Sequence, residues 1–242
     1  MRIALKTIIN FLNRDYIEFK GLKLPKQRSN QGLASNDLYI SETVAQISKF
    51  VSKSDAASSY ILDFGCGQGR LLNGLVYEEI PFGQYAGIDV DSRAISWCIN
   101  NLSYPNNVSF TWYNKNNERY NKAGKEINSL PVTKEHYTHI FSNSVFSHLN
   151  EIDVRLYAKL LRECLVLNGM LYLTAFTEEN VPNCEENPVG YFGEKNTSRL
   201  HRVRFNKDYF LEIFTSHGWQ VEGYYQNGIE RTGQSEIFLK KI

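Results

Sequence analysis

The chain has 242 residues, of which 27 are Lys or Arg and 26 are Asp or Glu. A charge this evenly balanced gives no global field to attract nucleic acid or an anionic membrane surface, so we expect a small-molecule partner. The length suits one large α/β domain with added segments, and no stretch is apolar enough to predict a membrane span.

The four cysteines are spread along the sequence, at Cys66, Cys98, Cys164 and Cys184. They form no C-x-x-C pair, and three of them stand in apolar segments where a thiol behaves as a small hydrophobe. This usage is typical of a reducing compartment and predicts a cytoplasmic protein. No cluster of His, Cys and Asp has metal-ligand spacing, so no metal site is expected.

A short amphipathic helix is predicted near the start, with an apolar face formed by Leu5, Ile8, Ile9 and Leu12. We expect it to pack against the domain, with a substrate lid or a dimer contact as alternatives. Residues 21–32 are polar and rich in turn formers, and they predict a loop. A second helix is expected from Ser35 or Asn36 to residue 51, with a buried side formed by Leu38, Val44, Ile47 and Phe50.

Residues 60–72 predict a buried strand at Tyr60–Phe64, a glycine turn, and a helix that begins near Gly69. The turn has the spacing G-x-G-x-G, with glycines at Gly65, Gly67 and Gly69. Glycine permits backbone conformations closed to other residues and lets a ligand approach the main chain. Arg70 occupies the position of the third glycine in the dinucleotide fingerprint G-x-G-x-x-G. Asp63, just before the turn, would repel a pyrophosphate and suits a ligand ammonium group.

This pattern resembles motif I of the class I S-adenosylmethionine-dependent methyltransferases, in which such residues hold the methionine part of the cofactor. The resemblance implies that S-adenosylmethionine is the cofactor and that it contacts Asp63, Gly65, Cys66, Gly67 and Gly69. In that family one or two helices before the first strand close over the cofactor. Residues 1–55 are therefore expected to form an N-terminal helical cap, with simple packing as the alternative role.

A second strand is predicted at residues 83–91 and a second helix at residues 92–102. Asp89 lies at the carboxyl end of this strand, where an acidic residue meets a ribose in nucleotide-binding βαβ units. A carboxylate accepts hydrogen bonds from both ribose hydroxyls, so Asp89 and the adjacent Val90 are expected at the cofactor. Asp91 is predicted to cap the helix that follows.

A third strand is predicted at residues 107–113 and ends beside Asn114. Family members often carry an aspartate at this point that contacts the adenine amino group, and the resemblance implies the same contact for the Asn114 carbonyl oxygen. The polar segment 115–136 is too long for an ordinary connection. We expect it to be partly helical and to lie over the sheet edge near the cofactor.

A fourth strand is predicted at residues 138–142, and a helix follows it up to about Leu167. Asn168–Gly169 is expected to be the C-cap of that helix. Residues 170–176 then predict the fifth strand.

The sequence S-V-F-S-H-L begins at Ser144, after the fourth strand. It resembles the fourth-to-fifth strand region of bacterial small-molecule methyltransferases, which extends the resemblance over residues 60–176. The resemblance implies a cofactor-binding core at residues 56–176, with Ser144 and Val145 as further cofactor contacts.

His148 is the expected catalytic residue, as a general base. It follows the fourth strand at the carboxyl edge of the sheet, where ligands of open α/β sheets bind. The unperturbed pKa of histidine, about 6.5, suits a base. An alcohol or phenol acceptor would need one, whereas an amine would not. The alternative is that His148 only packs or caps at the start of the next helix.

Residues 177–205 are polar, contain prolines and glycines, and predict a long substrate-side loop. Its candidate substrate contacts are Tyr191, Phe192 and His201, with ordinary solvent exposure as the alternative.

Residues 206–242 predict a helix followed by two strands. The helix is expected at residues 207–216, and the strands at residues 219–226 and 235–240. An antiparallel hairpin added to a parallel sheet is a further point of resemblance to the methyltransferases. So is Gln234, because small-molecule members often carry Q-D or Q-S at that point.

The sequence therefore predicts one α/β domain with the Rossmann-like methyltransferase fold, a seven-stranded and mostly parallel sheet flanked by helices. The predicted activity is transfer of a methyl group from S-adenosylmethionine to an oxygen or nitrogen of a small molecule, such as a natural product or a sugar. A non-catalytic module and a nicotinamide-dependent oxidoreductase are the alternatives. The oligomeric state is left open.

Overall fold

The computed structural model describes residues 15–28, 35–51, 56–102, 107–193 and 198–242. The helix predicted around residues 5–12 lies outside these ranges. Within them, no helix combines the length and apolar character needed to cross a membrane. All four cysteines are unpaired.

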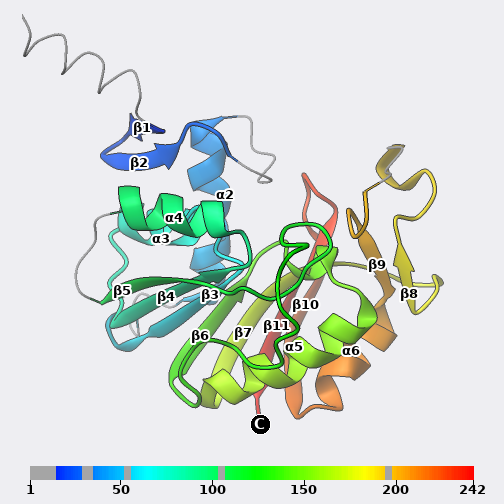
Figure 1. Ribbon diagram of the computed structural model, residues 1–242. Coiled ribbons are helices and arrows are strands. Elements are labelled where there is room, and N and C mark those ends of the chain that lie inside the picture. Colours follow the sequence, from blue (N-terminus) through cyan, green and yellow to red (C-terminus); the bar gives the residue numbers. More distant parts are fainter. Residues whose placement is uncertain (1–14, 29–34, 52–55, 103–106, 194–197) are drawn as a thin grey trace, which may run out of the picture.

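The centre of the molecule is a sheet with the strand order β10-β11-β7-β6-β3-β4-β5 (Figure 1). These strands are β3 (Tyr60–Phe64), β4 (Gln84–Asp89), β5 (Val108–Trp112), β6 (Tyr137–Ser142), β7 (Leu165–Glu178), β10 (Trp219–Ile229) and β11 (Gln234–Lys241). Neighbours from β5 to β7 run parallel, whereas β11 is antiparallel to both β7 and β10. This arrangement confirms the predicted fold.

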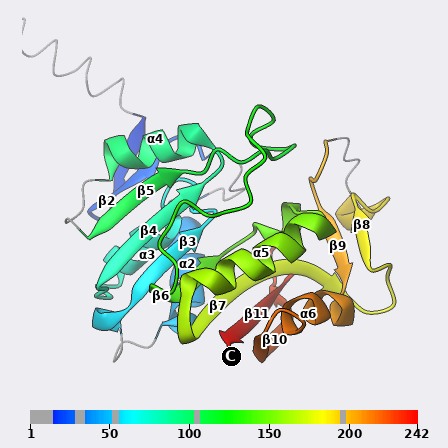
Figure 2. The same cartoon turned by 60° about the horizontal axis from the view of Figure 1, so that its bottom comes forward.

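Helices cover both faces of the sheet (Figure 2). One face carries α2 (Asn36–Phe50), α3 (Arg70–Tyr77) and α4 (Ser92–Asn101), and the other carries α5 (Glu151–Cys164) and α6 (Lys207–Thr215). Successive side chains of a strand point to opposite faces. Ile61 therefore packs with the first group of helices and Leu62 with the second, and both are almost fully buried. The sheet thus separates two apolar cores.

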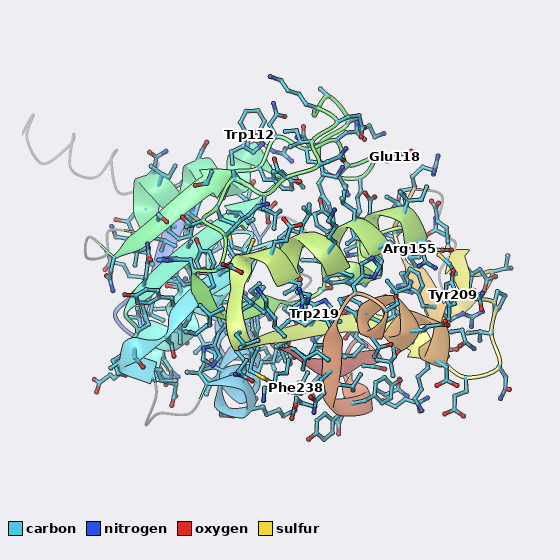
Figure 3. The ribbon with its side chains drawn as sticks, turned by 90° about the horizontal axis from the view of Figure 1, so that it is seen from below. Trp112, Glu118, Arg155, Tyr209, Trp219 and Phe238 are labelled. Carbon is cyan, nitrogen blue, oxygen red and sulfur yellow. The ribbon has the colours of Figure 1, made fainter. Side chains whose placement is uncertain are left out.

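Polar contacts fix α5 and α6 to each other (Figure 3). Arg155 Nη2 donates to the Tyr209 hydroxyl at 2.9 Å, and that hydroxyl donates to a Glu151 carboxylate oxygen at 2.5 Å. Trp219, at the start of β10, donates its indole N–H to the Ala158 carbonyl oxygen at 2.8 Å. These bonds tie the C-terminal part of the sheet to the helix that follows the site.

The segment predicted as a loop after residue 20 contains strand structure. β1 (Tyr16–Phe19) and β2 (Leu22–Pro25) form an antiparallel hairpin, so the loop prediction was wrong for residues 22–25. Its turn places Lys20 at φ 49° and Gly21 at φ 79°, and positive φ at both central residues matches the twist of a two-residue hairpin.

The hairpin also changes which face of α2 is buried. Tyr39 and Ile40 pack against the apolar side chains of β2, whereas Leu38 is 43% exposed. The prediction of a buried Leu38 was therefore wrong, although Ile47 and Phe50 are buried as expected. Ser35 is the N-cap, since its side chain accepts from the Leu38 N–H at 3.2 Å.

Two features around the sheet differ from the predictions. α5 ends at Cys164 rather than near residue 167, and Asn168 lies within β7 at φ 64°, where the pairing with β6 is irregular. Asn168–Gly169 therefore forms an irregularity in the strand and not a helix cap. Asparagine tolerates the left-handed conformation in both settings, so the sequence alone does not distinguish them. Residues 115–136 contain no helix, and isolated bridges join Lys115 to Lys125 and Asn117 to Asn121.

The predicted substrate-side loop has some regular structure. β8 (Cys184–Glu186) pairs with β9 (Val203–Asn206), and β9 adds parallel to the end of β7, which brings the sheet to nine strands. The loop is therefore anchored to the carboxyl end of β7. The expected C-terminal helix and antiparallel hairpin are present as α6, β10 and β11.

Candidate functional site

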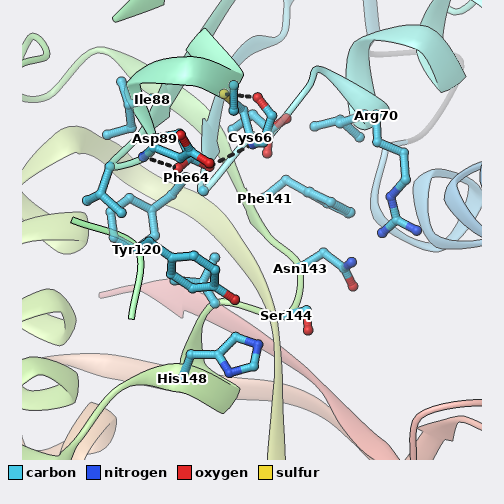
Figure 4. A pocket seen from close by; sticks show the side chains of 18 of the residues that line it. Phe64, Cys66, Arg70, Ile88, Asp89, Tyr120, Phe141, Asn143, Ser144 and His148 are labelled. Carbon is cyan, nitrogen blue, oxygen red and sulfur yellow. Dashed lines mark hydrogen bonds between the residues drawn. The ribbon is translucent and has the colours of Figure 1, made fainter. Parts of the chain in front are cut away.

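The candidate site lies where the order of the parallel strands reverses. β4 and β5 lie on one side of β3, and β6 and β7 lie on the other. Connections leave such a point in opposite directions, which opens a crevice at the carboxyl ends of the strands. A cavity of about 300 Å³ occupies this crevice (Figure 4). Its lining comes from the ends of β3, β4 and β6, from α2 and from the β10–β11 turn.

Most of the predicted site residues line this cavity. Those present are Asp63, Gly65, Cys66, Gly67, Asp89, Val90, Ser144, Val145 and His148. Those that do not line it are Gly69, Asn114, Tyr191, Phe192 and His201. The structure therefore brings together the two predicted carboxylates and the predicted base.

The glycine turn is fastened to β4. The N–H groups of Gly65 and Cys66 both donate to the Ile88 carbonyl oxygen, at 2.8 and 3.1 Å. Gly65 has φ 79°, and a Cβ built on it would overlap the Val145 side chain. Only glycine therefore fits this point, where the backbone of the turn forms part of the cavity wall. Gly69 does not line the cavity; it is the N-cap residue of α3, with φ 73°.

Asp89 links the end of β4 to the turn. One carboxylate oxygen accepts from the Gly67 N–H at 2.7 Å and the other from the Asp91 N–H at 2.8 Å. Burial raises the pKa of Asp89 to about 6, and these backbone donors oppose the rise. Each oxygen keeps a further acceptor position, so the carboxylate can also take hydroxyl groups.

Asp63 is the more deeply buried carboxylate, at 3% exposure. The Tyr85 hydroxyl donates to it at 2.6 Å. Burial raises the pKa of Asp63 to about 7, although the Tyr85 hydrogen bond and the charge of Arg70 both lower it. A cationic ligand in the cavity would favour the ionised form.

The Asn114 side chain points into the loop that follows β5, away from the cavity. Its carbonyl oxygen accepts from the Asn121 side chain at 3.1 Å, so the predicted adenine contact has no geometric support. The same segment instead contributes Asn117 and Tyr120 to the cavity lining. Sequence reasoning missed both, because this segment lacks the periodicity that would orient its side chains.

Ser144 is held in place from two other strands. Its N–H donates to the Thr174 hydroxyl at 2.7 Å, and its own hydroxyl accepts from the Gln234 amide at 2.9 Å. The Thr174 hydroxyl in turn donates to the Gln234 carbonyl oxygen at 2.7 Å. Ser144 has φ 59°, a conformation that this closed set of hydrogen bonds maintains.

His148 lies in a short 3-10 turn before α5, and its ring faces the cavity near Tyr120 (Figure 4). Its Nδ1 is 3.1 Å from the Leu200 carbonyl oxygen. A carbonyl oxygen only accepts, so Nδ1 carries the proton and Nε2 is the acceptor. Burial, together with the positive charge of Arg119, lowers the pKa of His148 to about 4. The assumption of an unperturbed pKa was therefore wrong, and the imidazole is neutral at physiological pH.

The three predicted substrate contacts brace the surrounding loops. The Tyr191 hydroxyl donates to Glu178 at 2.6 Å, and Arg119 donates to His201 Nδ1 at 2.7 Å. Phe192 is 51% exposed and packs over Gly233 in the β10–β11 turn. These side chains support segments next to the cavity without lining it.

Other cavity residues were not recognised from the sequence. They are charged or amide side chains from α2, α3 and the β10–β11 turn, namely Glu42, Gln46, Arg70 and Arg231. Arg70 lies within the glycine motif, where the sequence pattern marks it only as the residue in place of a third glycine. The others come from distant parts of the chain, and nothing in their local sequence marks them.

A family model described as a methyltransferase domain matches residues 37–224 of the chain. The chain belongs to this methyltransferase family. The matched region begins within α2 and ends in β10, so it contains the whole glycine turn, both carboxylates and His148.

Solved structures of methyltransferases share the fold. A putative S-adenosylmethionine-dependent methyltransferase from Listeria monocytogenes has a TM-score of 0.56 at 12% identity, covering 83% of this chain and 98% of its own. The 1,6-didemethyltoxoflavin-N1-methyltransferase of Burkholderia thailandensis, solved with S-adenosylhomocysteine, has a TM-score of 0.58 at 12% identity over 85% and 79%. The glycopeptide N-methyltransferase MtfA, complexed with S-adenosylmethionine, has a TM-score of 0.57 at 13% identity over 84% and 87%.

Proposed function

We propose that this methyltransferase transfers a methyl group from S-adenosylmethionine to an oxygen or nitrogen atom of a small molecule. The observation that carries the proposal is a single cavity that joins Asp63, Asp89 and His148. Two of the similar structures bear the names of a 1,6-didemethyltoxoflavin-N1-methyltransferase and a glycopeptide N-methyltransferase, which supports an acceptor of this kind.

The residues present fit S-adenosylmethionine. The cavity of about 300 Å³ has the size of a small-ligand site, and glycine backbone forms part of its wall. Asp89 would take the ribose hydroxyls with its remaining acceptor positions, and Asp63 would take the ammonium group. The buried carboxylate of Asp63 disfavours a dinucleotide pyrophosphate, and Arg70 takes the place of the glycine that a dinucleotide fingerprint has at the sixth motif position.

When bound, S-adenosylmethionine supplies a methyl group that its sulfonium already activates. The contribution of the chain is then to position the acceptor and exclude water, and correct positioning alone can lower a barrier by about 7–11 kcal/mol. His148 Nε2 faces the cavity as a hydrogen-bond acceptor, so it can orient an acceptor O–H or N–H and receive its proton. The Leu200 carbonyl holds the ring in that tautomer.

Calorimetry and a screen for methylated products together test the proposal. Calorimetry with S-adenosylhomocysteine and with NAD separates a methyltransferase from an oxidoreductase. Incubation with S-adenosylmethionine and a panel of alcohols, phenols, amines and sugars, followed by mass spectrometry, should then yield a product heavier by one methylene. Binding of S-adenosylhomocysteine without any methylated product across the panel would favour a non-catalytic module. Absence of that binding would refute the proposed function.

A further inference from the structure

Arg70 is a buried cation with few partners among the residues that the structure describes. It is the first residue of α3, directly after the glycine turn, and is 9% exposed. A guanidinium has five N–H donors. Its nearest partners are the Gln46 carbonyl oxygen, 3.4 Å from Nη2, and a Glu42 carboxylate oxygen, 3.7 Å from Nη1. Its donors therefore remain largely available on the side that lines the cavity.

The two neighbours of Arg70 are engaged elsewhere. Glu42 accepts two hydrogen bonds from Arg231, from Nε at 2.6 Å and from Nη2 at 3.2 Å, so most of its charge is balanced by that side chain. The Gln46 amide donates to the Asn143 carbonyl oxygen at 3.0 Å. Neither residue satisfies Arg70, and an anion in the cavity would complete its hydrogen bonding.

The position of Arg70 indicates which anion it would take. Asp89 and Arg70 lie on opposite sides of the cavity, and the glycine turn runs between them (Figure 4). A ligand with its ribose at Asp89 would therefore extend past Asp63 towards Arg70. At that end, Asp63 would meet an ammonium group and Arg70 a carboxylate, as in an α-amino acid.

We propose that Arg70 binds a carboxylate, which is the α-carboxylate of the methionine part of S-adenosylmethionine. This inference rests on the proposed function. A carboxylate belonging to the methyl acceptor has the same chemistry, and the binding experiment below separates these two sources.

The test compares two ligands in calorimetry, S-adenosylhomocysteine and 5′-methylthioadenosine, which lacks the amino-acid end. Arg70→Met should weaken binding of S-adenosylhomocysteine by about tenfold or more, and it should leave binding of 5′-methylthioadenosine within about twofold. Glu42 keeps its ion pair with Arg231 in Arg70→Met, so the substitution leaves no unpaired carboxylate at that point. Retained binding of 5′-methylthioadenosine verifies that the variant is folded.

Two further variants sharpen the comparison. Glu42→Gln removes the carboxylate that competes for Arg70, so it should leave the affinity for S-adenosylhomocysteine equal or increase it. Arg93→Met removes an arginine whose side chain is 84% exposed, and it should change neither affinity.

Three outcomes would overturn the inference. Unchanged affinity of Arg70→Met for S-adenosylhomocysteine would leave an acceptor carboxylate as the remaining ligand. If Arg70→Met lost affinity equally for both ligands, Arg70 would serve to maintain the glycine turn and not to bind a carboxylate. If Glu42→Gln lost as much affinity for S-adenosylhomocysteine as Arg70→Met, the Arg70–Glu42 pair would have a structural role and would not bind the ligand directly. If the unmodified protein binds neither ligand, it is the proposed function that fails.

Discussion

Asp63→Asn should make the unliganded protein more stable at alkaline pH. Burial raises the pKa of this carboxyl group from its ordinary value of 3.8 to about 7 in the folded protein. Its folded pKa is raised, so the folded state holds a proton that the unfolded state has released, and stability falls as pH rises from about 4 to about 7. The asparagine variant keeps the shape and the acceptor for Tyr85 and has no charge to bury.

The size of the effect follows from the shift in pKa. The rise of this pKa from 3.8 to about 7 corresponds to about 4 kcal/mol, since a tenfold change in the ionisation constant is about 1.4 kcal/mol. Of this, about 2 to 3 kcal/mol falls between pH 5 and pH 8. For a chain of this length the melting temperature changes by roughly 2–4 °C per kcal/mol. The variant should therefore gain roughly 5–10 °C over the natural sequence when the pH is raised from 5 to 8.

Differential scanning calorimetry of both proteins at several pH values measures this difference. Asp89 and other titrating groups are present in both proteins, so only their electrostatic coupling to Asp63 differs between the two. Tyr85→Phe is a matched control, because it removes the hydrogen bond that lowers the pKa of Asp63 and should move the loss of stability to higher pH. An equal pH dependence in the natural sequence and Asp63→Asn would refute the raised pKa. Asp63→Asn should also weaken S-adenosylhomocysteine binding, since the ligand ammonium loses its partner.

Three other substitutions test the rest of the site. Asp89→Ala should weaken S-adenosylhomocysteine binding in calorimetry by about tenfold or more, and unchanged affinity would refute the assignment to ribose. His148→Ala should lower the methylation rate without lowering that affinity, whereas full turnover would make the residue structural. Because the pKa of His148 is lowered to about 4, protonation of this residue should not reduce the rate of the natural sequence above about pH 5. Gly65→Ala should abolish binding through overlap with Val145, and binding that persists would exclude the close backbone approach.

The parts of the fold that depend on local pattern were predictable. β3 has the predicted bounds, Asp63 and Asp89 both line the cavity beside the glycine turn, and Asp91 caps α4 by accepting from the Arg93 N–H at 2.9 Å. In each case one short stretch carries the complete signal, from alternating apolar residues to a turn and a cap. Parallel strands then bring their carboxyl ends to one edge, so the residues at those ends come together without further information.

The remaining features depend on contacts between distant segments. Tyr39 is buried because β2 lies over α2. The local sequence alone predicts burial equally well for Leu38. The pKa of His148 depends on Arg119 and on burial under the segment that contains Leu200. Arg231 reaches the cavity through Glu42, which lies 189 residues away in the chain. The periodicity of apolar residues in a sequence does not predict such contacts between distant segments.

The placement of β11 has a consequence for the order of assembly during synthesis. β11 lies between β7 and β10, so β10 has no neighbour in the sheet until β11 has emerged from the ribosome. The same strand begins with Gln234, which completes the hydrogen bonds around Ser144. A nascent chain that has only reached β10 would therefore contain the whole glycine turn and still lack a finished cavity. Acquisition of ligand binding should follow translation of β11 rather than folding of the earlier βαβ units.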